Sequence, residues 1–161
     1  MIVHKYPNSI LYGAFSDTTS QTPAAINTPY PITMNTTDLV DGIYLGSPTS
    51  RIYCPKSSVY NFQFSLQLSS SNASLKTIAI WARINGADVA NSATRITISG
   101  SGTLQVAAWN FVLPLNAGQY FELVWATDDT TIALAYSAAQ TSPYARPAVP
   151  SVIMTVTEVY H

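Results

Sequence analysis

The stretch that decides the fold reads Tyr60-Asn61-Phe62-Gln63-Phe64-Ser65-Leu66-Gln67-Leu68. Every second residue is large and apolar, and the residues between them carry amides or hydroxyls. Because successive side chains of a β-strand point to opposite faces, the stretch predicts a strand with one apolar face and one polar, uncharged face. Surfaces that meet only water are usually rich in charged side chains. The absence of charge here therefore indicates that much of this face contacts protein.

Strand signals continue along the chain, separated by turn residues, whereas the helical spacing of apolar residues is nearly absent. The pattern predicts the following strands: Leu11–Asp17, Ile32–Met34, Gly42–Leu45, Arg51–Tyr53, Val59–Leu68, Thr77–Ile84, Thr94–Ile98, Gln105–Leu115, Tyr120–Ala126, Ile132–Ser137 and Ser151–Tyr160. Asn85-Gly86 is the strongest hairpin signal, because both residues tolerate positive φ. Asn116-Ala117-Gly118 is expected to close the strands on either side of it against each other.

About ten short antiparallel strands in a chain of this length predict an all-β fold, a two-sheet antiparallel jelly-roll sandwich. An immunoglobulin-type sandwich is the alternative, but its disulfide form needs two cysteines and this chain has only Cys54. We expect residues 1–10 to form a short N-terminal arm and residues 11–161 to form the jelly-roll domain.

The chain carries very little charge. Charged residues make up 9% of its 161 residues, against about 25% in typical soluble domains, and the formal net charge is −1. With so little repulsion between copies, an oligomer that covers part of the surface is favoured over a monomer. Lys and Arg are scattered singly, which argues against nucleic-acid binding. The apolar runs are too short for a transmembrane helix, and Met1–Leu11 lacks the apolar core of a signal peptide, so we expect synthesis in the cytoplasm.

Side chains that would carry catalysis are missing or isolated. The two histidines, His4 and His161, lie at the ends of the chain, so neither a nucleophile–base pair nor a histidine metal cluster is expected. Glu122 and Glu158 are the only glutamates, and nothing in their spacing indicates the paired carboxylates of a glycosidase. We therefore expect no enzymatic activity, no metal and no cofactor.

The remaining acidic candidates are Glu122 and the pair Asp128-Asp129. Glu122 alternates with apolar residues, so it should lie opposite the core, with Arg83 or Arg95 as candidate partners. Asp128-Asp129 lies between two predicted strands. Calcium takes roughly six to eight oxygen ligands, and the other carboxylates are distant in the sequence. A plain turn is therefore favoured over a calcium site.

Three segments resemble the jelly rolls of the tumour-necrosis-factor and complement-head family. Ser58-Val59-Tyr60-Asn61-Phe62 resembles the family's G-x-Y-x-F strand, with Ser58 in place of the glycine. Ile80–Gly86 resembles its apolar strand that ends in Asn-Gly. Leu113–Leu123 resembles its L-x-L-x-x-G-D-x-V-x-L segment, with Gln119 in place of the acid. The resemblance runs from Leu11 to Val159 and implies the same jelly roll.

Further segments resemble a class of tailed-bacteriophage virion proteins with this jelly roll: Tyr12–Thr22, Ala25–Thr28, Ala107–Leu113 and Pro150–Thr157. Such domains occur as capsid decoration (cement) proteins and as tips of tail fibres. The resemblance implies a homotrimer in which one sheet of each subunit faces a threefold axis. The strands implied to face it are Leu11–Asp17, Val59–Leu68, Gln105–Leu115 and Ser151–Tyr160. The candidate trimer-interface residues are Tyr12, Phe15, Tyr60, Trp109 and Phe111.

Only a short segment precedes the first family-like strand, whereas a tail fibre needs an anchor and a shaft, so we favour the decoration role. We expect a structural protein on the capsid surface of the virion that bridges neighbouring subunits of the major capsid protein. The candidate capsid contacts are His4, Lys5 and Tyr6. The alternative is a tail-fibre or receptor-binding tip that recognises host glycans. Its candidate contacts are Asp128, Asp129, Tyr144 and Arg146.

Overall fold

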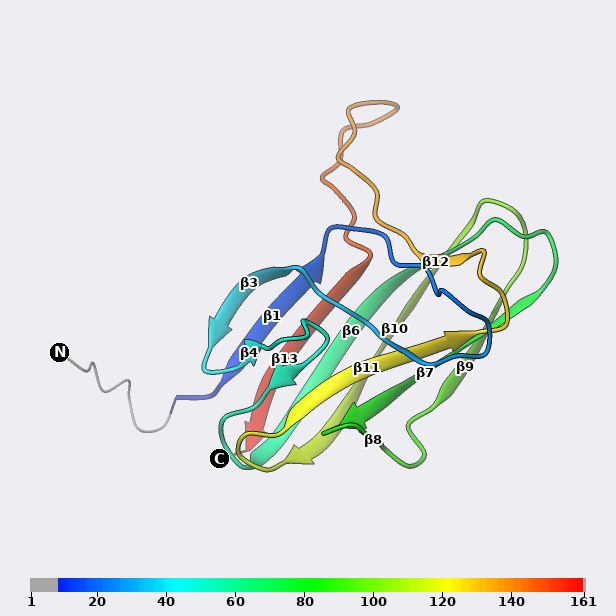
Figure 1. The fold of residues 1–161 in the computed structure, drawn as a ribbon. Helices are drawn as coiled ribbons and strands as arrows, with labels where there is room; N and C mark the ends of the chain where they lie inside the picture. Colours follow the sequence, from blue (N-terminus) through cyan, green and yellow to red (C-terminus); the bar gives the residue numbers. More distant parts are fainter. Residues whose placement is uncertain (1–8, 161) are drawn as a thin grey trace.

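The computed structural model describes residues 9–160, which form thirteen strands in two antiparallel sheets that pack face to face (Figure 1). The described part of the chain contains no helix, and hence none that is long and apolar enough to cross a membrane. This architecture confirms the predicted all-β, two-sheet jelly roll.

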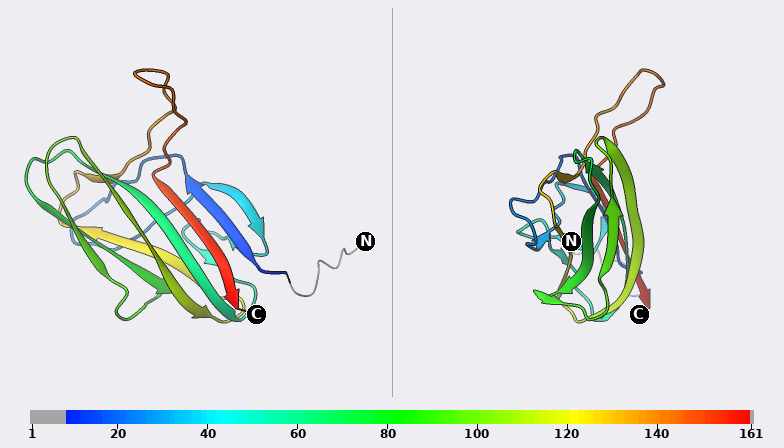
Figure 2. Two further views of the ribbon diagram at one scale, coloured as in Figure 1. Left: turned by 180° about the vertical axis from the view of Figure 1, so that it is seen from behind. Right: turned by 90° about the vertical axis from the view of Figure 1, so that its right-hand side faces the viewer.

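Sheet A contains the first and last strands of the described chain and the two strands of thirteen residues. Its spatial order is β10 (Thr103–Leu115), β6 (Ser58–Ser70), β13 (Val152–Tyr160), β1 (Tyr12–Asp17) and β3 (Thr36–Asp41), and β12 (Ile132–Leu134) also pairs with β6. The view from behind in Figure 2 looks onto this sheet, with the red β13 between β6 and the blue β1. The four strands that the phage resemblance assigns to the threefold axis thus lie side by side in one sheet.

Sheet B forms the other layer. Its order is β4 (Tyr44–Leu45), β5 (Ile52–Tyr53), β11 (Tyr120–Thr127), β7 (Lys76–Ile84) and β8 (Ala87–Asp88), with β2 (Tyr30–Pro31) paired to β11 and β9 (Thr94–Ile98) paired to β7. Asn85 and Gly86 have φ values of 49° and 81° and join β7 to β8 in a tight hairpin. This confirms the hairpin predicted at Asn85-Gly86.

The connections along the second half of the chain cross from one sheet to the other. Residues 99–102 lead from β9 in sheet B to β10 in sheet A, and residues 116–119 lead back to β11 in sheet B. The prediction that Asn116-Ala117-Gly118 closes a paired hairpin is therefore wrong, because β10 pairs with β6 and β11 pairs with β7. Such crossings distinguish a jelly roll from a simple meander.

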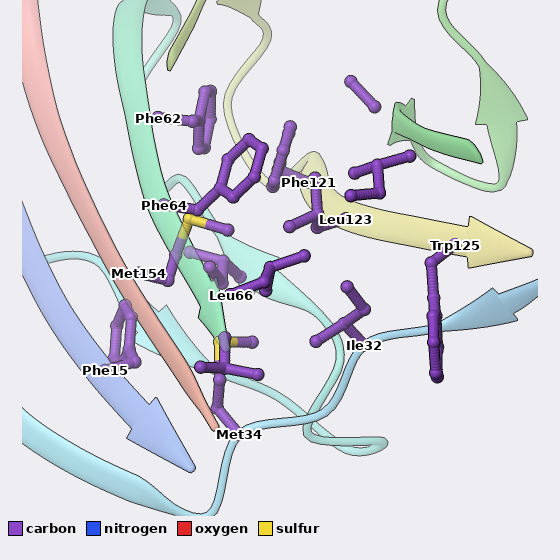
Figure 3. Packing of buried hydrophobic residues seen from close by; sticks show 14 of the residues in the cluster. Phe15, Ile32, Met34, Phe62, Phe64, Leu66, Phe121, Leu123, Trp125 and Met154 are labelled. Carbon is purple, nitrogen blue, oxygen red and sulfur yellow. The ribbon is translucent and has the colours of Figure 1, made fainter. Parts of the chain in front are cut away.

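The core fills the space between the two sheets with alternate residues of the long strands. The ring of Phe62 from β6 stacks on that of Phe121 from β11, with centroids 4.1 Å apart (Figure 3). Phe62, Phe121 and Leu66 are fully buried, and Leu123 is 2% exposed. Stacked aromatic rings and interdigitated aliphatic side chains hold the sheets together by burial and close packing. The predicted inward orientation of Phe62 is confirmed.

The observed strands differ from the predicted ones at several places, including β8, which was not predicted, and β12, which ends at Leu134 rather than Ser137. Thr36–Asp41 forms β3, which the sequence did not reveal because its side chains are mostly exposed and show no apolar alternation. Near Ile32–Met34 the assigned strand is instead the two-residue β2, Tyr30–Pro31. Ile32 and Met34 are nevertheless buried, and the Ile32 backbone N–H donates to the Leu123 carbonyl. That segment packs on sheet B without the continuous ladder of a longer strand.

Candidate functional site on the outer face of sheet A

The outer face of sheet A is formed by the residues that alternate with the core set, and none of those on β10, β6 and β13 is charged. In β6 the core set comprises Tyr60, Phe62, Phe64, Leu66 and Leu68, all less than 5% exposed. The outer set on the three strands comprises Val106, Ala108, Asn110 and Val112 of β10, Asn61, Gln63, Ser65 and Gln67 of β6, and Ile153, Thr155, Thr157 and Val159 of β13. We call these residues the uncharged face.

Strand register arranges the uncharged face in straight rows. Gln63 of β6 lies between Asn110 of β10 and Thr155 of β13. In antiparallel sheets, directly opposed side chains on one face are close enough to interact. The neighbouring row contains Asn61 and Val112, and the Asn110 side-chain amide donates across to the Asn61 side-chain oxygen at 2.9 Å. The result is a continuous surface of amides, hydroxyls and aliphatic groups.

Large aliphatic side chains on this face are open to solvent. The exposed fractions are 56% for both Val106 and Val112, 42% for Ile153 and 58% for Val159. A single exposed aliphatic side chain is ordinary, but several on adjacent strands without an intervening charge form an apolar surface of the kind found at protein interfaces. The face is therefore suited to contact another protein surface.

Strand β10 forms one border of this face and is an unprotected edge. It pairs with β6 along its whole length without a register shift, and no other named strand pairs with it. Its thirteen residues include no charged side chain. Edge strands are usually blunted by charges, bulges or central prolines, because unpaired backbone groups invite another chain. Here only Pro114, near one end, interrupts the edge.

Two aromatic side chains line the same edge. Trp109 and Phe111 point toward the core side of β10, where both rings contact Phe64, with centroids 4.6 Å and 6.0 Å from its ring. Both are only partly buried, and Trp109 Nε1 has no hydrogen-bond acceptor in the described chain although the atom itself is buried. Part of each ring is thus available to a neighbouring molecule at the edge of sheet A.

Charge is kept off this face by the strand alternation. Glu158 of β13 points inward, where its carboxylate forms an ion pair with Lys56 Nζ at 2.9 Å and accepts from the Leu11 backbone N–H at 3.1 Å. Burial alone would raise the pKa of Glu158, but the Lys56 ammonium and the Leu11 N–H, together with the nearby Ser58 hydroxyl, hold that pKa below its usual value. The glutamate of β13 is therefore a buried structural group.

The neighbouring Tyr60 belongs to the same buried polar site. Its hydroxyl donates to the Lys56 carbonyl at 2.6 Å. Burial, followed by the proximity of Cys54 and Glu158, raises the pKa of Tyr60 to about 12. Burial likewise raises the pKa of the Cys54 thiol to about 12, so this thiol is an inert core group.

The predicted trimer-interface residues divide into two groups. Phe15 and Tyr60 are 0% exposed in the single chain, because both belong to the core-facing sets of their strands. Their side chains cannot reach a neighbouring subunit, so the prediction is wrong for these two. Tyr12 is partly exposed, and Trp109 and Phe111 lie at the edge, so these three stay predictions. The predicted capsid contacts His4, Lys5 and Tyr6 lie outside the described residues.

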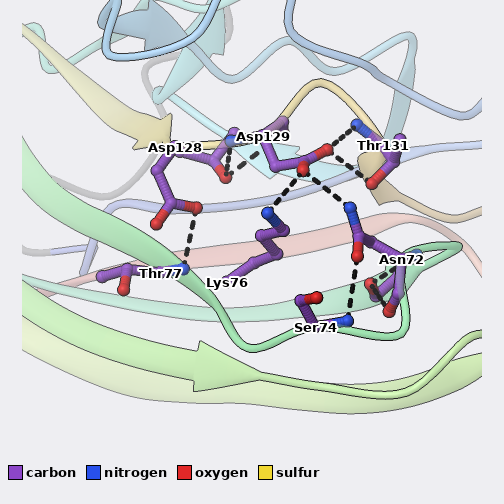
Figure 4. Close-up of polar contacts among 9 residues, drawn as sticks. Asn72, Ser74, Lys76, Thr77, Asp128, Asp129 and Thr131 are labelled. Carbon is purple, nitrogen blue, oxygen red and sulfur yellow. Dashed lines mark hydrogen bonds and ion pairs between the residues drawn. The ribbon is translucent and has the colours of Figure 1, made fainter.

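The predicted glycan contacts do not form one site. The Asp129 carboxylate accepts from Thr131 N–H at 2.7 Å and from Asn72 Nδ2 at 3.0 Å, and it pairs with Lys76 Nζ at 2.9 Å (Figure 4). The two hydrogen bonds from Thr131, followed by the contact with Lys76, lower the pKa of Asp129. Asp128 accepts from the Thr77 backbone N–H at 2.9 Å. Both carboxylates thus fasten the turn after β11, as the predicted turn requires.

The other two predicted glycan contacts lie on a projecting hairpin, residues 137–149. Tyr144 is 65% exposed near its tip. Arg146 is half-buried, and its guanidinium donates to the Ala138 and Pro147 carbonyls and to the Ser137 hydroxyl, at 3.1, 2.9 and 2.7 Å. Arg146 therefore braces the hairpin, whereas the Tyr144 ring is free to meet a ligand.

Glu122 lies on the outer face of sheet B, as expected, but its partners differ from those predicted. Ser50 Oγ donates to Glu122 Oε1 at 2.7 Å, and Arg51 Nε lies 3.6 Å from the same oxygen. Arg83 is opposite Glu122 in the strand register but instead pairs with Asp88 at 2.8 Å. Strand alternation alone does not identify the loop residues Ser50 and Arg51 as partners of Glu122.

Comparisons with known proteins support the fold. No family model matches the sequence, and no curated protein matches it. The structure is similar to that of the globular domain of zebrafish complement 1qA protein, with a TM-score of 0.56 over 95% of this chain and 99% of that chain. The two sequences are 15% identical, so the likeness establishes a shared fold alone. It confirms the complement-head-like jelly roll that the sequence segments indicate.

Proposed function

We propose that this chain is a structural protein of a tailed-bacteriophage virion that trimerises through sheet A and decorates the capsid shell without catalytic activity. The observation that carries the proposal is the uncharged face, with its rows of amides and exposed aliphatic side chains. The segments that resemble tailed-bacteriophage virion proteins support a role in the virion. The uncharged face supports self-association.

The shape of sheet A favours a closed ring. One flank of the uncharged face is the bare edge of β10, where Trp109 and Phe111 are partly exposed. If the edge of one subunit packs against the face of the next, the contact joins two different surfaces, and three such contacts close a cyclic trimer. Covering the edge also removes the hazard of open-ended strand pairing.

A trimer that binds the capsid shell would stabilise the assembled shell. A protein that binds the assembled shell but not free capsid subunits stabilises the shell in proportion to the logarithm of its concentration over Kd. Three linked copies at a local threefold position of the shell strengthen individually weak contacts through avidity. The partners are therefore a second and third copy of this chain and the major capsid protein.

The proposal is tested by measuring solution mass and capsid binding together. Purified protein is weighed by light scattering after size exclusion and is then sedimented with empty capsids of the phage that encodes it. We expect a trimer mass and saturable cosedimentation. A trimer that ignores capsids but adsorbs to host cells would replace decoration with the tail-fibre alternative. A monomer both in solution and on the shell would refute the trimer.

A further inference from the structure

The hairpin of residues 137–149 stands out from the jelly roll (Figures 1 and 2). It is closed by two antiparallel pairs, Ser137 with Val149 and Gln140 with Arg146, each joined by two backbone hydrogen bonds of 2.8 to 3.1 Å. None of its residues belongs to the hydrophobic core cluster. An ordered segment that contributes nothing to the core points to a role at the surface.

Arg146 makes this hairpin stiff. Its side chain crosses between the two legs and donates three hydrogen bonds to Ala138, Pro147 and Ser137. The Gln140 side-chain amide adds a bond to the Tyr144 carbonyl at 3.3 Å near the tip. A loop that is already ordered loses less conformational entropy when it binds a ligand. The hairpin is therefore pre-organised for binding a ligand.

A cavity of about 390 Å³ lies between the hairpin and one end of the uncharged face. Gln67 of β6 and Leu104 of β10 form its floor, and Ser137, Gln140, Tyr144 and Arg146 form its wall. Leu104 is 74% exposed and Tyr144 is 65% exposed. In the described chain the Gln67 amide, the Gln140 side-chain oxygen and the Tyr144 hydroxyl make no hydrogen bonds. The cavity therefore combines two apolar surfaces with several unused donors and acceptors.

This chemistry suits a sugar ring. A pyranose offers an apolar C–H surface to an aromatic or aliphatic side chain and hydroxyls to amides. The lining contains no carboxylate, and Arg146 is its only cation. One cation is too few for a nucleic-acid backbone, which needs several convergent charges. The volume lies at the lower end of the range of small-ligand sites, which fits one or two sugar rings.

We propose that this cavity binds carbohydrate, with Tyr144 and Leu104 against the ring faces and Gln67 and Gln140 on the hydroxyls. The site shares only Gln67, in an end row, with the uncharged face and lies outside the central rows, so the proposal goes beyond trimerisation and capsid binding. It gives the molecule an outward-facing recognition element for glycans of a cell surface or its surroundings.

The test uses the full-length protein, a glycan array of bacterial-surface and mucin saccharides, and saturation-transfer NMR with the best-binding saccharide. The variants are Tyr144→Ala and Gln67→Ala. The control is Tyr44→Ala, which removes another exposed tyrosine, one on sheet B that stacks on Tyr53. We expect at least a tenfold loss of affinity in the first two variants and unchanged affinity in the control. Circular dichroism confirms that each variant is folded.

Three results would overturn the carbohydrate site. One is an array without a binding saccharide, and another is binding that survives both Tyr144→Ala and Gln67→Ala. The third is a change in solution mass in these variants without a change in saccharide binding, which would make the cavity a contact between subunits. Solution mass and capsid cosedimentation of the same samples report on the proposed function, so the two proposals can fail separately.

Discussion

The outer faces of the two sheets are built on the same strand alternation, yet they differ in the side chains that they present. The uncharged face of sheet A presents amides, hydroxyls and aliphatic groups. The outer face of sheet B holds the ion pairs Arg83–Asp88 and Arg51–Glu122. It also holds an aromatic stack in which the Tyr44 and Tyr53 rings lie 5.3 Å apart.

The difference shows that charged side chains are absent from the uncharged face of sheet A but present on the outer face of sheet B. Charged residues on the outer face of sheet B form ion pairs. Asp88 accepts hydrogen bonds from both Trp81 Nε1 and Arg83 Nε, each at 2.8 Å. Those two hydrogen bonds lower the pKa of Asp88. Part of the outer face of sheet B is thus charged and solvated, with Glu122 buried against Ser50 and Arg51, whereas the uncharged face of sheet A is a surface that another protein can cover without desolvating a charge.

The largest expected effect comes from placing one charge on each face. Thr155→Lys puts an ammonium in the middle row of the uncharged face, and Thr97→Lys puts the same group on β9 of sheet B, opposite Thr77. Three buried like charges around a threefold axis cost several kcal/mol. We expect Thr155→Lys to yield monomers in light scattering at concentrations where Thr97→Lys stays trimeric.

Either of two outcomes would break the contrast between the faces. Trimers that persist in Thr155→Lys would show that the uncharged face is not the trimer contact. Dissociation of Thr97→Lys would place that contact on sheet B. Circular dichroism should be unchanged in both variants, because each substituted side chain lies outside the core.

The next effect concerns the core that both faces share. Phe62→Ala removes the ring that stacks on Phe121 across the two sheets and should lower the free energy of unfolding by about 3–5 kcal/mol. The measurement is urea unfolding in the Thr155→Lys background, where association does not contribute. Val112→Ala, at a 56% exposed position of the uncharged face, is the control and should change the same quantity by less than about 0.5 kcal/mol. Equal losses in the two variants would contradict the assignment of inner and outer sets.

Much of this inner and outer division could be predicted for β6 but not for its neighbours. In β6 the apolar and polar residues alternate strictly, so the sequence alone identifies Phe62 as inward and Gln63 as outward. In β10 both alternate sets are largely apolar, so Trp109 and Val112 cannot be assigned to a face before the register with β6 is known. The same ambiguity led to the wrong prediction for Phe15, since β1 has small or aromatic residues on both sides.

The contacts of the loops were the least predictable part of the molecule. Arg51 reaches Glu122 because a loop that is distant in sequence folds back onto a strand, and Arg146 braces its own hairpin through contacts within that loop. Strand periodicity contains no information on such contacts. The projecting hairpin was visible in the sequence only as a proline-containing segment, and the cavity beneath it depends on Leu104 and Gln67 from two separate strands.

A smaller effect is expected from the buried carboxylate beneath sheet A. Glu158→Gln should lower stability at neutral pH by about 1–3 kcal/mol, because it removes the charge that accepts from Lys56 and Leu11. The folded-state pKa of Glu158 lies below its unfolded value, so the stabilisation is present above about pH 4.3 and is lost as the pH falls through the folded pKa. Urea unfolding at pH 7 and at pH 3 should therefore show the wild type losing its advantage over Glu158→Gln in acid. A difference between the two proteins that is independent of pH would rule out this role.

The smallest effect is expected on the charged face of sheet B. Asp88→Asn keeps an acceptor for Trp81 Nε1 but removes the ion pair with Arg83, and the Asp88 side chain is 58% exposed. Exposed ion pairs of this kind contribute about 0.2–1 kcal/mol and are weakened by salt. We expect a loss of stability in that range at low salt that shrinks at high salt, with the trimer mass and capsid cosedimentation unchanged. If Asp88→Asn alters mass or capsid binding as strongly as Thr155→Lys does, sheet B is itself an interface, and low charge density ceases to be the property that separates the two faces.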